Sequence, residues 1–167
     1  MNLFILSLFQ KEIAEWMFDK HIVKIILEAV QMLCTAKLLL DPDDSSNDKL
    51  YKISHKNHPV SLWVRKSYKN YLWTLILVNE MHNEWRYRFN HPLTKFHKSF
   101  LVAVHLLKNK PAPNKFELVE LTPFATAMPD QYKILNDPIE SYRKYYMSDM
   151  KKGLAKWTNR EKPEWFH

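Results

Sequence analysis

The chain has 167 residues, a formal net charge of +7, one cysteine and one glycine. This length suits one domain with a full hydrophobic core. The lone Cys34 excludes a disulfide framework and fits a reducing compartment. The single glycine, Gly153, excludes the glycine-rich loops of nucleotide-binding enzymes and the nucleophile elbow of hydrolases. It also argues against an all-β fold, because tight hairpins favour Asn-Gly or Asp-Gly turns.

Helical patterns follow one another along most of the chain. The expected helices cover residues 11–39 with a bend near Asp19, residues 59–89, residues 94–107, a short stretch at 122–128, and residues 137–153. Acidic and proline-containing loops separate them at 41–48 and 108–115. Residues 3–6 and 116–119 are the expected short strands. The pattern predicts one compact all-α domain over residues 1–167, with a long central helix and at most a few short strands.

The longest apolar run, at residues 21–40, contains Lys24, Glu28, Gln31 and Lys37. A membrane-spanning helix would not carry four such residues without special partners. The first nine residues lack a basic leader and a small-residue cleavage site. We therefore expect a cytoplasmic protein with no membrane contact.

The first expected helix carries a narrow polar stripe. On a helical wheel His21, Lys24, Glu28 and Gln31 share an arc of about 80°, with Lys20 beside them. Apolar residues occupy nearly all of the remaining surface, which is the reverse of an ordinary surface helix. The stripe therefore either forms a Lys24–Glu28 pair on a partly solvated face or lines a ligand-binding or catalytic cleft.

Two further clusters combine basic and aromatic residues. In the first, Pro59 suits the start of a helix, which makes His58 or Asn57 its cap. The alternative is that this helix start grips a phosphate together with Arg65. His55 and His58 lack clear further metal ligands, so we expect no metal and no cofactor.

The second of these clusters lies near residue 88, and it too has one structural and one phosphate-binding interpretation. Glu84 and Arg88 stand four residues apart, so they form a helix salt bridge, or Arg88 contacts a phosphate while Tyr87 or Trp85 stacks on a base. The aromatic and basic tail at 156–166 either packs on the core or covers a binding groove.

The runs Phe18-Asp19-Lys20-His21-Ile22-Val23-Lys24, TPFATAMPDQYK at 122–133 and YRKYY at 142–146 resemble a family of small uncharacterised bacteriophage proteins. The KNHP run at 56–59 and its long flanking helices more distantly resemble the endonuclease V type of pyrimidine-dimer DNA glycosylase. That resemblance implies a helical fold, attack on the sugar by the chain's own α-amino group, and assistance from a glutamate on a helix. It also implies that a base is flipped out of the duplex. The size of Asn2 predicts that Met1 is retained.

The leading hypothesis is a DNA-acting base-excision enzyme, a glycosylase with or without AP-lyase activity, for damaged or modified bases in double-stranded DNA. The amine of Met1 or Lys24 would be the nucleophile and Glu28 the general acid and base. The other candidate site residues are His21, Lys20 and Gln31 on the stripe, and His58, Trp63, Arg65, Glu84, Arg88 and His97 for substrate binding. The alternatives are a non-catalytic phage accessory protein that binds nucleic acid or a nucleotide, and a helical interaction protein.

Overall fold

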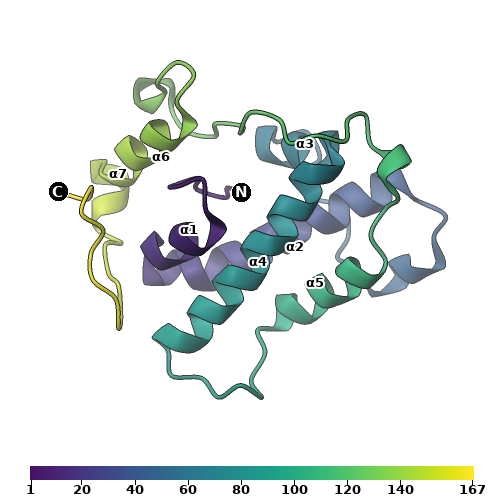
Figure 1. Ribbon diagram of the computed structural model, residues 1–167, viewed down its shortest axis with the longest axis horizontal. Coiled ribbons are helices and arrows are strands. Elements are labelled where there is room, and N and C mark those ends of the chain that lie inside the picture. The colour runs from purple at the N-terminus through teal and green to yellow at the C-terminus, as the bar shows by residue number, and fades with distance from the viewer.

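The computed structural model describes residues 1–167 and consists of helices joined by irregular segments, without a β-sheet (Figure 1). The helices are α1 (Gln10–Trp16), α2 (Asp19–Leu40), α3 (Pro59–Lys66), α4 (Tyr68–Arg88), α5 (Lys98–Lys108), α6 (Pro138–Tyr146) and α7 (Asp149–Lys152). Short 3₁₀ turns lie at Ser45–Lys49, Pro113–Lys115 and Asp130–Tyr132. The predicted all-α class with a long central helix is confirmed.

Helix α2 lies at the centre of the molecule because apolar residues occupy most of its surface. It packs against α3, α4 and α5. Helix α1 packs against α4. Its buried apolar side chains recur at helical spacing: Ile22, Ile25, Ile26, Ala29, Val30, Met32 and Leu33. The residues of the polar stripe are among those that remain for contacts other than core packing.

Two predicted helices are each interrupted, at positions that long-range contacts determine. Residues 11–39 divide at Met17 and Phe18, both of which have extended backbone and buried side chains. Residues 59–89 divide at Ser67, whose side chain accepts the N–H of Asn70 and donates to the carbonyl of Glu120. Ser67 therefore caps α4 and also fixes the segment that follows α5.

Other predicted elements differ from the structure. The third helix begins at Lys98 rather than near residue 94, and the last one breaks between α6 and α7. No helix forms at 122–128, because the N–H of Thr122 donates to the Asn70 side chain and that of Ala127 to the Tyr142 hydroxyl. The two short strands are also absent. Phe4 has a positive φ of 49°, and residues 116–119 contribute only an isolated bridge between Leu118 and Ser67.

The C-terminal tail packs on the core, as one of its two interpretations predicted. The indole N–H of Trp157 donates to the carbonyl of Trp16 over 2.8 Å, and the N–H of Asp19 donates to the carbonyl of Lys156 over 2.9 Å. The buried ring of Phe166 packs edge-on against Phe18. In Figure 1, α6 and α7 cover the N-terminal segment, so the two ends of the sequence lie on the same side of α2.

None of the helices has both the length and the continuous apolar character that crossing a bilayer requires.

Replacing Asn70 by Ala is expected to lower the free energy of unfolding by about 2–3 kcal/mol. The buried Asn70 amide donates to the carbonyl of Trp63 and to the Thr122 hydroxyl, and accepts the N–H of Thr122. The variant leaves these groups unpaired. Chemical denaturation measures the change, with Asn79→Ala on the exposed face of α4 as the matched control. Equal stability of the two variants would show that the hydrogen bonds of the Asn70 side chain do not stabilise the fold.

Candidate functional site

A pocket of about 250 Å³ opens between the N-terminal segment, α2, the end of α6 and α7. It contains three residues of the predicted stripe on α2, His21, Lys24 and Glu28. Its walls come from distant parts of the sequence: Met1, Asn2, Phe4, His21, Lys24, Ile25, Glu28, Ala127, Tyr145 and Lys151. The fold therefore brings three of the predicted catalytic residues on α2 together with the predicted amine at Met1.

Asn2 holds the beginning of the chain against this pocket. Its backbone N–H donates to Oε2 of Glu28 over 2.9 Å, and its side-chain amide donates to the carbonyl of Ala127 over 2.7 Å. Its side-chain oxygen accepts the N–H groups of Leu3 and Phe4. All of these bonds form next to Met1, so they hold the peptide that joins Met1 to Asn2 against the pocket wall.

The carboxylate of Glu28 lies between two amines. The α-amino nitrogen of Met1 is 3.8 Å from Oε2, and Nζ of Lys24 is 3.6 Å from Oε1. The Met1 side chain is only 5% exposed although the whole residue is half-buried, so its solvent contact lies on the main chain, where the amine is. The predicted Lys24–Glu28 pair is present, and it faces a pocket.

His21 forms part of the pocket wall but is buried and neutral. Its ring stacks on Phe4 with centroids 4.4 Å apart, and its Nδ1 is hydrogen bonded to the hydroxyl of Tyr146. Burial, followed by the positive charges of Lys151, Lys24 and Lys20, lowers the pKa of His21 to about 3. A histidine in this state can support the aromatic wall, but it carries no proton to donate as an imidazolium at neutral pH.

Lys151 is a pocket residue that the sequence analysis did not identify. It reaches the pocket from α7, and its Nζ lies 5.2 Å from the ring centre of Phe4 and 5.1 Å from that of Tyr145. Burial lowers the pKa of Lys151, and the charge of Lys24 lowers it further, whereas Glu28 opposes the shift. No motif or spacing in the sequence connects this lysine to α2.

His58 caps α3, as predicted, and lies near the pocket. Its Nδ1 accepts the N–H of Val60 over 3.2 Å, so the neutral ring carries its proton on Nε2. Burial lowers the pKa of His58, followed by the charge of the chain's amino terminus and that of His55, while Glu28 acts in the opposite direction. On α2, Lys20 is exposed and Gln31 is half-buried. These two residues do not line the pocket.

Three other predicted binding residues have structural contacts away from the pocket. Trp63 is buried, and its indole N–H donates to the carbonyl of Thr122. The guanidinium of Arg65 donates to the carbonyl of Lys56, and His97 caps α5 through the N–H of Ser99. The structure does not bring these side chains to the carboxylate of Glu28.

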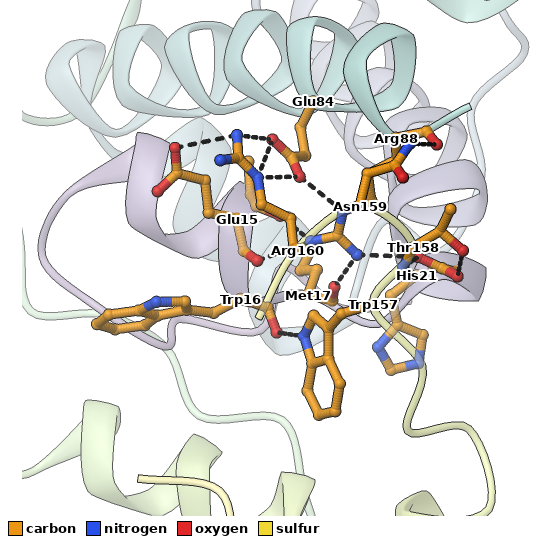
Figure 2. Close-up of polar contacts among 12 residues, drawn as sticks. Glu15, Trp16, Met17, His21, Glu84, Arg88, Trp157, Thr158, Asn159 and Arg160 are labelled. Carbon is orange, nitrogen blue, oxygen red and sulfur yellow. Dashed lines mark hydrogen bonds and ion pairs between the residues drawn. The ribbon is translucent and has the colours of Figure 1, made fainter. Parts of the chain in front are cut away.

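Arg88 and Glu84 form the centre of a buried ionic network instead (Figure 2). All five N–H groups of Arg88 are used. Its acceptors are Oε1 of Glu84, Oδ1 of Asp19 and the carbonyls of Ala14, Glu15 and Met17. Arg160 from the tail also binds the carboxylate of Glu84, and Thr158 donates twice to Asp19. The helix salt bridge predicted for this pair is therefore confirmed, and Arg88 has no donor left for a phosphate.

Comparison with known proteins identifies no relative. No family model matches the chain, and no curated protein or solved structure matches it either. The resemblances to a bacteriophage family and to the endonuclease V type of glycosylase therefore remain predictions.

Arg88→Met is expected to lower the free energy of unfolding by about 3–5 kcal/mol, because it leaves buried carboxylates and carbonyls without their donor. Arg88→Lys should also destabilise the protein, since one ammonium cannot reach five acceptors. Arg65→Met is the control, and only a small change is expected for it. Chemical denaturation provides the measurement. A stable Arg88→Met variant that had lost DNA affinity would instead make Arg88 a ligand contact.

The stability of the protein is expected to fall as the pH falls below about 6.5. The unfolded chain then takes up a proton at His21, whereas the folded chain does not until its pKa of about 3 is reached. The loss is about 1.4 kcal/mol per pH unit for one such group. His21→Gln should reduce this slope, measured by denaturation between pH 7 and pH 4. Replacing the exposed Asn57, which does not titrate, by Ala should leave the slope unchanged.

Proposed function

We propose that the protein is a DNA-acting enzyme of the base-excision type, a glycosylase with AP-lyase activity that acts on double-stranded DNA in the cytoplasm. The observation that carries the proposal is the α-amino nitrogen of Met1, 3.8 Å from the carboxylate of Glu28 at the wall of an open pocket. An amine beside a carboxylate is the pair of groups that Schiff-base chemistry on a sugar aldehyde needs.

The two groups have complementary roles in this chemistry. The unprotonated amine attacks the C1′ aldehyde of an abasic deoxyribose, and the resulting carbinolamine loses water to form an imine. Glu28 accepts the proton that leaves the amine and donates one to the departing hydroxyl. The same carboxylate then removes a proton from C2′, and the C3′–O bond breaks with release of the 3′ phosphate. The strand is thereby cut without any cofactor.

Met1 suits the role of nucleophile better than Lys24 does. The pKa of α-amino groups as a class is roughly 8 and that of lysine side chains about 10.4. At neutral pH an α-amine is therefore free of its proton far more often. Lys24 is also 65% exposed, whereas the peptide next to the Met1 amine is held against the pocket by the bond from Asn2 to Glu28. Lys24 is better suited to bind substrate at the pocket mouth.

Charge and size both agree with a sugar–phosphate ligand. The chain carries a net charge of +7, which favours a polyanionic partner. Exposed Lys52, His55 and Lys56 lie in the loop before His58, whose pKa responds to the amino terminus of the chain. The pocket, at about 250 Å³, is smaller than the roughly 300–1,000 Å³ of typical small-molecule sites. An abasic sugar with its phosphate suits this volume better than a whole nucleotide does.

Borohydride reduction is expected to trap a covalent complex between the protein and a duplex that contains one abasic site. Glu28→Gln should lower the yield of the trapped complex at least about a hundredfold, as expected for the loss of a general acid and base. Glu117→Gln, an exposed acid outside the pocket, is the matched control. The absence of a complex with abasic duplexes and with several base lesions, together with intact DNA strands, would overturn the proposal.

A second measurement identifies the nucleophile and distinguishes the proposed enzyme from the alternative function. Peptide mapping of the trapped complex should place the adduct on Met1, and two residues added before Met1 should abolish it while Lys24→Met retains it. A non-catalytic nucleic-acid-binding protein would bind DNA in a salt-dependent manner without forming an adduct. In that case Glu28→Gln would leave binding unchanged.

A further inference from the structure

The pocket contains more positive than negative charge. The amines of Met1, Lys24 and Lys151 line this pocket together with one carboxylate, that of Glu28. Glu28 is also engaged by Asn2, whose N–H donates to Oε2. Met1 and Lys24 thus share this one carboxylate, and Lys151 has no acidic partner within the pocket.

Lys151 is the least compensated of these groups. The amines of Met1 and Lys24 both lie within 4 Å of Glu28, but Lys151 forms no ion pair. Its neighbours are the faces of Phe4 and Tyr145, which attract a cation more weakly than a carboxylate does. Lys24 acts on it across the pocket as a like charge. A half-buried ammonium in this position is unfavourable unless an anion also binds there.

We infer that Lys24 on α2 and Lys151 on α7 together form a phosphate-binding subsite at the mouth of this pocket. The two side chains line the same pocket from different helices, and a phosphate presents several oxygen acceptors that can bond both ammonium groups at once. The identity of the ligand as a sugar phosphate rests on the proposed function, whereas the binding of an anion rests on the charges alone. In the proposed reaction the subsite holds the phosphate next to the abasic sugar and so orients C1′ toward the Met1 amine.

The position of Lys151 also gives α7 a role. This helix has only four residues, Asp149–Lys152, and contributes no buried residue to the core. The tail that follows it is fixed to α1 and α2 by the bonds of Trp157 and Thr158. Those bonds hold the end of α7 next to the pocket. Lys151 is the one residue of α7 that lines the pocket.

The test compares Lys151→Gln with Lys152→Gln, because Lys152 is the adjacent lysine on the same helix and is exposed. The first probe is inorganic phosphate, titrated while the backbone amide signals of Phe4 and Ala127 are followed by NMR. The wild type and Lys152→Gln should show saturable shifts, and Lys151→Gln and Lys24→Gln should weaken binding at least about tenfold. Lys151→Arg should retain binding, which excludes a merely structural effect.

The second probe is a duplex with a tetrahydrofuran abasic analogue, which has no aldehyde and cannot form an imine. If DNA supplies the phosphate, Lys151→Gln should weaken binding of this duplex and reduce the slope of log K against log salt by about one. If a free phosphate or nucleotide is the ligand, only the first probe should depend on Lys151. Equal behaviour of Lys151→Gln and Lys152→Gln with both probes would overturn the inference.

These outcomes are independent of the proposed reaction. Loss of phosphate binding in Lys151→Gln, with no borohydride-trapped complex in the wild type, would retain the subsite and reject the enzyme. A trapped complex at Met1 with no effect of Lys151→Gln on either probe would retain the enzyme and reject the subsite.

Discussion

The arrangement of α1, α2 and α4 depends on the buried guanidinium of Arg88. A helix leaves its last carbonyl groups without partners, and those at the end of α1 accept hydrogen bonds from Arg88. The same side chain reaches Asp19 at the start of α2 and Glu84 on its own helix. Because a buried charge is stable only when it is fully paired, this arrangement is specific. The direction of α2, and thus of its polar stripe, follows from it.

The periodicity of apolar residues was sufficient to predict the class of fold and its long helices, because burial of one helix face is a local property of the sequence. The break between α1 and α2 falls where a bend near Asp19 was predicted, whereas the interruption at Ser67 and the irregular segment at 122–128 were not predictable in this way. Ser67 leaves the helical conformation with its hydroxyl bonded to the carbonyl of Glu120. Residues 122–128 stay irregular because the side chains of Asn70 and Tyr142 take their backbone bonds. Each of these partners is distant in the sequence.

The difference between local patterns and long-range contacts also explains what could be predicted of the site. Lys24 and Glu28 were grouped correctly because residues four apart share a helix face, whereas only a family resemblance suggested Met1. Lys151 was missed because α7 reaches the pocket through tertiary contacts alone. Arg88 has the residue type of a phosphate contact, and only its surrounding carbonyl groups distinguish a structural role. The charge of a side chain is visible in the sequence, but the number of its hydrogen-bond partners is not.

The walls of the pocket come from both ends of the sequence, and this has a consequence for protein synthesis. The amine of Met1 and its neighbour Glu28 leave the ribosome early, whereas Tyr145 and Lys151 leave it much later. A nascent or stalled chain that ends before Lys151 carries the amine of Met1 without the lysine that completes the pocket. The pocket is thus assembled only after translation has passed α7.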